Sequence, residues 1–300
     1  MHFDALKELV TLRGGFDTLY SNPILANVIF WYAAPLSPRN PTDIIRVDVC
    51  GSVTEVNKPN FPIPSQIISP ELHQQDIPIP LLTTQISNAW RWKFPDQQEI
   101  MNIMNDCRSY TTQLKAEVKR TNGGIYSEGR FAAHGILPLL HRALCLESDM
   151  LDDSQQKCDA VRLGCMLYFA EIRRLFGIMG ILSKYQTQKL RISLQSQEDD
   201  WGALDILKAW VLAMGCIESS GAERAWFFQR LQVSRGRLGI DTWDELQVQF
   251  RDILWYGHVH DTTFKEVVDG TERVLRPGLL GGSKFGGYRP LLYGVTPILN

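Results

Sequence analysis

The chain has 300 residues, 44% of them hydrophobic and 21% charged, and a formal net charge of −2. This length accommodates one large domain or two small ones with a sizeable core. A net charge this small creates no overall electric field that would draw the protein onto nucleic acid or an anionic membrane. No run of about 18 uncharged apolar residues occurs, so we expect no membrane span.

The cysteines favour an intracellular protein. None of the six is paired as C-x-x-C: Cys50, Cys107, Cys145, Cys158, Cys165 and Cys216. Most lie inside apolar helical patterns, as reduced and buried thiols do. Residues 2–10 carry Asp4, Lys7 and Glu8 where a signal peptide needs an apolar core, so we expect no signal peptide.

The chain opens with a helical pattern. One face of residues 3–12 is apolar: Phe3, Leu6, Leu9 and Val10. Gly14 and Gly15 would end this helix, because glycine readily adopts positive φ. Pro23 suits the first turn of a second helix, which ends before Pro35. Because no partner helix precedes the first pattern, we expect further sequence upstream.

Residues 36–96 differ in character. Ten of the 15 prolines fall between Pro35 and Pro95, and no 3.6-residue period survives there. Proline removes amide donors and restricts the residue before it. We therefore predict a long Pro-rich connection over residues 36–96.

Apolar periodicity then predicts helices over residues 97–120, 134–147 and 152–182, with a weak helix over 184–197. The stretch 201–231 is the expected centre of the fold. Asp205 and Lys208 are its only charges between residues 201 and 216, and a helix that is apolar nearly all round is enclosed by other helices. Ser220 and Glu223 have the spacing of a capping box at the start of the next helix.

A last helix is predicted over residues 241–255, where Thr242 and Glu245 again have capping-box spacing. The chain beyond Gly270 is rich in glycine and proline and shows no period. We therefore predict an all-α fold: one multi-helix domain over residues 1–262, containing the Pro-rich connection, and an irregular tail over 263–300.

Two polar groupings carry candidate chemistry. His258, His260 and Asp261 form H-x-H-D, which could ligate a metal if extended but otherwise reads as a polar helix exit. A basic stretch could meet phosphates or an acidic segment, or be a solvated helix end: Arg173, Arg174, Lys184, Lys189 and Arg191. No nucleophile or acid–base constellation stands out. We predict no enzyme and no catalytic, cofactor or metal site.

Several stretches resemble one family. Residues 2–19 carry R-G-G between apolar positions, and residues 28–34 form an expected helix with a tryptophan. Residues 160–177 contain the pattern I-R-R-x-F, and residues 207–227 contain the pattern W-x-L…E-R-x-W-F. Residues 241–261 contain an expected closing helix with L-W. Together they resemble the fungal-specific transcription-factor regulatory domain, usually found C-terminal to a zinc binuclear-cluster DNA-binding segment. The motif residues are Arg13, Gly14, Gly15, Trp31, Arg173, Arg174, Trp210, Glu218, Glu223, Arg224, Trp226 and Trp255.

The resemblance implies an all-α, nuclear regulatory domain that controls transcription through protein partners, with a small-molecule effector as a further option. The motif residues would be packing residues. The family's six-cysteine DNA-reading segment has no counterpart here, so we do not expect this chain alone to bind DNA. The alternative is a stand-alone small-molecule-binding helical protein, with a pocket between the central hairpin and the helix over residues 158–182.

Overall fold

The computed structural model describes residues 52–59, 84–146, 153–177, 183–195 and 201–275, with single positions among residues 8–18 and at 49 and 82. Of the described residues 85% are helical and none lies in a strand, which confirms the all-α prediction. Within these ranges no helix is both long and apolar enough to cross a membrane. Arg13, Trp31 and the chain beyond residue 275 lie outside the described residues.

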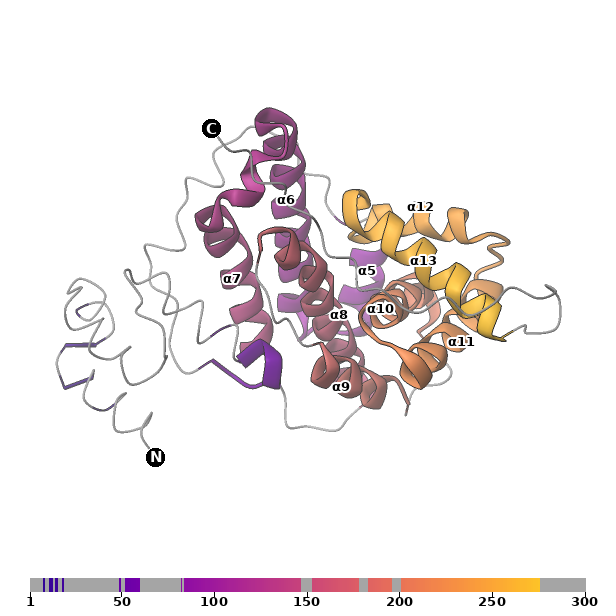
Figure 1. Cartoon of the computed structure of the whole chain (residues 1–300). Coiled ribbons are helices and arrows are strands. Elements are labelled where there is room, and N and C mark those ends of the chain that lie inside the picture. The colour runs from indigo at the N-terminus through magenta and orange to yellow at the C-terminus, as the bar shows by residue number, and fades with distance from the viewer. Residues whose placement is uncertain are drawn as a thin grey trace, which may run out of the picture.

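The helices follow one another with short connections and are labelled as in Figure 1. They are α5 (Thr84–Lys93), α6 (Gln98–Thr121), α7 (Gly129–Cys145), α8 (Asp153–Leu175), α9 (Lys184–Gln195), α10 (Asp205–Glu218), α11 (Gly221–Arg237), α12 (Trp243–Ile253) and α13 (Gly257–Leu275). Two 3-10 turns, Gly124–Ser127 and Gly202–Leu204, precede α7 and α10.

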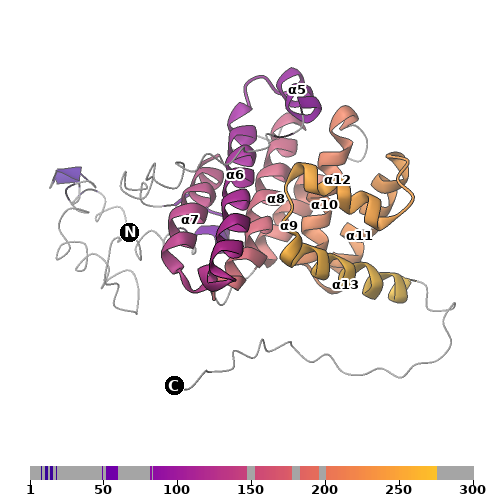
Figure 2. The same ribbon diagram turned by 90° about the horizontal axis from the view of Figure 1, so that it is seen from above.

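Helix α10 is the centre of the molecule, as its sequence predicts. Every residue from Leu207 to Ile217 is buried, and α10 contacts α8, α9, α11, α12 and α13. Figures 1 and 2 show α10 between α8 on one side and α11 to α13 on the other. A helix with so few charges is stable in water only when other helices cover it on all sides.

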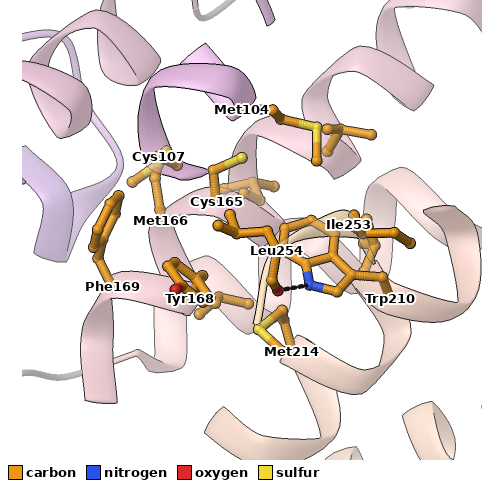
Figure 3. Close-up of a cluster of buried hydrophobic side chains, with 14 of the residues drawn as sticks. Met104, Cys107, Cys165, Met166, Tyr168, Phe169, Trp210, Met214, Ile253 and Leu254 are labelled. Atoms are coloured by element: carbon orange, nitrogen blue, oxygen red, sulfur yellow. Dashed lines mark hydrogen bonds between the residues drawn. The ribbon is translucent and has the colours of Figure 1, made fainter. Parts of the chain in front are cut away.

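Trp210 joins α10 to two other elements. Its indole is fully buried, and Nε1 donates a hydrogen bond of 2.7 Å to the Leu254 carbonyl, just beyond α12 (Figure 3). On the α8 side the ring lies against Gly164, where a Cβ atom would come within 2.9 Å of Trp210 Cζ3. The absence of a side chain at Gly164 therefore lets α8 and α10 approach closely.

The predicted capping boxes differ in outcome. At α12 the Thr242 hydroxyl accepts from the Glu245 amide at 3.1 Å, and the Glu245 carboxylate accepts from the Thr242 amide at 3.2 Å, so this capping box is confirmed. At α11 Ser220 makes no side-chain capping bond, and that prediction is wrong. The Glu223 carboxylate instead accepts from the Thr187 hydroxyl of α9 at 3.1 Å.

The predicted Pro-rich connection over residues 36–96 is wrong for its last part, where Thr84–Lys93 forms α5. No proline falls between Pro80 and Pro95, and Ile86 and Trp90 bury one face of a helix. Helix α7 also begins five residues before its predicted start and contains Pro138 in its interior.

The predicted irregular tail from residue 263 is wrong as far as residue 275, because α13 continues to Leu275. Phe264, Val267 and Val268 are buried at helical spacing, and the Phe264 ring contacts Trp255 at 5.7 Å between centroids. Gly270 does not end the helix, since burial of this apolar face outweighs a glycine's cost of about 1 kcal/mol.

We expect Trp210→Ala to lower the free energy of unfolding by about 3–5 kcal/mol, because it removes a fully buried aromatic ring and leaves the Leu254 carbonyl without its donor. Denaturant unfolding measures this loss. The control is Trp92→Ala on α5, whose tryptophan is 87% exposed and should cost about 0.5 kcal/mol or less. Equal losses in both variants would contradict the central position of Trp210.

Candidate functional site

Two of the motif residues meet in an ion pair. Glu218 at the end of α10 accepts from Arg174 Nη1 and Nη2 of α8, each at 2.7 Å, and from the Ser183 hydroxyl at 2.5 Å. The Glu218 side chain is 2% exposed and that of Arg174 is 36% exposed. A bidentate arginine–carboxylate pair of this kind fixes both distance and orientation, so it holds the ends of α8 and α10 together.

Glu171 completes this cluster on α8. Its carboxylate accepts from Arg174 Nη1 at 2.8 Å. Burial raises the pKa of Glu171, and the negative charge of Glu218 raises it further. Burial alone would lower the pKa of Arg174, but its hydrogen bonds and attraction to Glu218 outweigh this and raise it. One guanidinium thus serves two carboxylates in a closed structural clamp.

The other motif residues of α8 and α11 also make structural contacts. Arg173 is buried, and Arg224 Nε donates to the Ser219 carbonyl at 2.7 Å. The Trp226 ring lies under two guanidinium groups, those of Arg230 at 3.8 Å and Arg191 at 5.3 Å. Cation–π contacts of this kind join α9 to α11.

The basic stretch is therefore not one exposed patch. Arg173 and Arg174 belong to the interior and the clamp, while Lys189 Nζ donates to the Val56 carbonyl at 3.0 Å. Arg191 covers Trp226. These positions do not present a continuous row of cations to a phosphate backbone.

The second polar region is the α12–α13 corner, residues 252–261. The last carbonyls of a helix lack partners within the helix. Here Arg108 Nη1 of α6 donates to the carbonyls of Asp252 and Ile253, and Trp210 Nε1 donates to the carbonyl of Leu254. Side chains from α6 and α10 thus satisfy the buried end of α12.

Asp261 ties this corner together from the other side. Its Oδ1 accepts from Trp255 Nε1 at 2.6 Å and from Gln247 Nε2 at 2.7 Å. Its Oδ2 accepts from Arg251 Nη2 at 3.1 Å. The motif residue Trp255 is thereby fixed with its ring buried.

The three side chains named in the H-x-H-D motif lie in different environments. His258 is exposed, His260 is fully buried, and Asp261 is engaged with Trp255, Gln247 and Arg251. Across the described part of the chain, no group of three or more His, Cys, Asp or Glu side chains could hold a metal ion. The structure therefore gives no support to a metal site at this motif.

His260 is buried between aromatic rings. Its ring stacks on Tyr168 at 4.8 Å between centroids, and Nδ1 lies 3.1 Å from the Tyr256 carbonyl oxygen. Nε2 has no hydrogen-bond partner among the described residues. Burial lowers the pKa of His260 to about 4, so the ring is neutral at physiological pH.

An open pocket of about 540 Å³ lies between α6 and the start of α13, and we name it the corner pocket. Its lining includes Lys115, Arg251, Trp255, Tyr256, His258 and Asp261. Beside it the hydroxyls of Tyr126 and Tyr256 lie 2.5 Å apart, and the Tyr126 ring stacks on His258 at 6.0 Å. It is a different place from the predicted pocket between the central hairpin and α8.

No family model, curated protein or solved structure matches this chain. The resemblance therefore rests on the quoted residues, and the structure adds that two of them, Arg174 and Glu218, are bonded to each other. Sequence reasoning missed Lys115 and Arg251. Neither stands in a motif, and only the packing of α6 against the corner brings them to one pocket.

We expect Glu218→Gln to lower the free energy of unfolding by about 2 kcal/mol, because it removes the charge from a buried, hydrogen-bonded ion pair. Denaturant unfolding of the variant measures the loss. The control is Glu99→Gln, since Glu99 also pairs with an arginine, Arg142, but its side chain is 43% exposed. A surface pair contributes about 1 kcal/mol or less, so equal losses would contradict the clamp.

The buried His260 should make stability depend on pH. Its pKa is about 4 in the folded protein and about 6.5 when unfolded, so only the unfolded chain gains a proton as pH falls through this window. Stability is then complete above about pH 6.5 and falls by up to about 3 kcal/mol toward pH 4.

Unfolding curves between pH 4.5 and 7 test this expectation. The slope of unfolding free energy against pH should be smaller in His260→Gln than in the wild type, because the variant takes up about one proton fewer on unfolding. The exposed His258→Gln variant is measured alongside it, to account for replacing a histidine at the same corner. Parallel curves for His260→Gln and the wild type would show that His260 does not carry this dependence.

Proposed function

We propose that this chain is a regulatory and interaction domain of the fungal transcription-factor type. The Arg174–Glu218 ion pair is the observation that carries the proposal. Arg174 belongs to the pattern in residues 160–177 and Glu218 to the pattern in residues 207–227. If both patterns belong to one fold, some of their residues should be in contact, as these two are. A nuclear location and protein partners form part of the same proposal.

The roles of two carboxylates, Glu218 and Asp261, support regulation rather than catalysis. Glu218 joins α8 to α10, and Asp261 holds Gln247, Arg251 and Trp255 at the corner. Their hydrogen bonds go to other protein groups and stabilise helix packing. A catalytic acid or base would instead direct its reactive atom toward a substrate.

A reporter experiment tests this function. The full chain is fused to a heterologous DNA-binding domain and expressed in a fungal cell that carries a reporter gene with the matching sites. We expect reporter transcription to rise or fall several-fold relative to the DNA-binding domain alone. The Trp210→Ala fusion should lose the effect, because the interaction surfaces depend on the packed core.

Two controls are needed: immunoblots measure the amount of each fusion protein, and DNA occupancy at the reporter shows that the fusion is bound to its sites. A wild-type fusion that occupies its sites at normal level, yet leaves transcription unchanged in both activation and repression formats, contradicts the proposal. An effect that persists unchanged in an unfolded Trp210→Ala fusion contradicts it equally, since an unfolded segment would then be responsible.

The alternative function, small-molecule binding, is supported by one specific observation. The corner pocket has a volume of about 540 Å³, within the range of about 300–1,000 Å³ that small-molecule sites occupy. A ligand there would be the effector of a regulatory domain or the main ligand of a stand-alone protein.

A further inference from the structure

We infer that the corner pocket binds a small metabolite through a phosphate monoester group. The pocket lies where α6 meets the α12–α13 corner, and its polar lining comes from three helices. This inference rests on the small-molecule alternative proposed above and names its ligand class, and it does not depend on the regulatory function, because binding is a property of the purified chain.

Two cations from different helices border the pocket. Lys115 projects from α6, and Arg251 stands near the end of α12. Lys115 Nζ is 3.5 Å from the Trp255 carbonyl, at the outer limit of a hydrogen bond. Arg251 donates through Nη2 to Asp261, and its side chain is 54% exposed. Both groups therefore retain N–H donors for a ligand.

The acid of the pocket offsets only part of this positive charge. Asp261 forms an ion pair with Arg251 at 3.1 Å and also accepts from Trp255 and Gln247, so the lining carries two cations against one carboxylate. The pKa of Lys115 is lowered, first by burial and then by the positive charges of Arg108 and Arg251, which outweigh the opposing effect of Asp261. A pocket whose cations repel one another gains most from an anion.

His258 adds a third donor at the rim. Its ring is exposed at the second residue of α13 and is held by stacking on Tyr126. The pocket is thus lined by a lysine, an arginine and an imidazole from three different helices. A phosphate monoester has three terminal oxygens and about two negative charges at neutral pH, whereas a carboxylate has two oxygens and one charge. The arrangement therefore favours phosphate.

The size of the pocket indicates a phosphate ester rather than the free ion. About 540 Å³ exceeds the space that a phosphate group alone would fill. The remaining lining includes Trp255 and Tyr256, each 2% exposed, which form a fixed wall instead of mobile side chains. The net charge of −2 provides no field for a long polyanion, so a small molecule fits better than a nucleic acid.

Isothermal titration and thermal unfolding of the purified full chain test the inference. The probes are inorganic phosphate and glycerol 3-phosphate at pH 7.5, with ionic strength held constant by sodium chloride. We expect saturable binding of both probes, with tighter binding of glycerol 3-phosphate, and a rise in melting temperature that follows occupancy. Succinate, which has two carboxylates, should bind at least about tenfold more weakly.

Charge-removing variants locate the site. Lys115→Gln with Arg251→Gln should weaken glycerol 3-phosphate binding at least about tenfold. Lys119→Gln is the matched control, because Lys119 is an exposed lysine of α6 one turn further on, and it should bind within about twofold of the wild type. The Arg251–Asp261 pair is solvent-exposed, so the double variant should stay folded; if it does not, Lys115→Gln alone replaces it.

Three results would overturn the inference. The first is that neither probe shows saturable binding up to about 20 mM at constant ionic strength, a concentration above the dissociation constants of ordinary weak ligands. The second is wild-type affinity in the charge-removing variants. The third is equal affinity for succinate, which would assign the pocket to carboxylates. The first result would also remove the support for the small-molecule alternative, whereas the regulatory proposal is tested separately by the reporter experiment.

Discussion

The hydrogen bond from Trp210 to the Leu254 carbonyl is the contact on which the rest of the structure depends. Helix α12 ends in the interior, where each unsatisfied carbonyl would cost about 1–3 kcal/mol. Trp210 and Arg108 supply the missing donors, and they belong to α10 and α6. The positions of three helices, α6, α10 and α12, are therefore coupled at one point.

This coupling explains why a buried histidine and an open pocket lie so close together. The chain reverses between α12 and α13, and His260 enters the core while His258, two residues earlier, stays at the surface. Asp261 fixes the turn through Trp255 and Arg251. A ligand between Lys115 and Arg251 would contact both α6 and α12, so its binding would depend on how those helices are packed.

Local patterns allowed much of the fold to be predicted, and long-range contacts explain the failures. The run of apolar residues in α10 predicted its enclosure, and Thr242 with Glu245 predicted a real capping box, because both signals lie within one helix. Ser220 and Glu223 have the same spacing, but Thr187 of α9 takes the carboxylate. At the corner pocket the sequence singled out Trp255, His258 and Asp261, but it gave no signal for Lys115 and Arg251, which reach the same pocket only in the folded chain.

The two polar regions show how exposure gives similar residues different roles. In the clamp, Glu218 is 2% exposed, and its oxygens are held by Arg174 and Ser183. The buried carboxylate of this pair therefore serves to hold helices together. At the corner, Arg251 also pairs with a carboxylate, but it is 54% exposed and uses one of its terminal nitrogens for that bond. Arg251 also lines the open pocket and keeps further N–H donors, so this arginine can fix the corner and still receive the proposed anion.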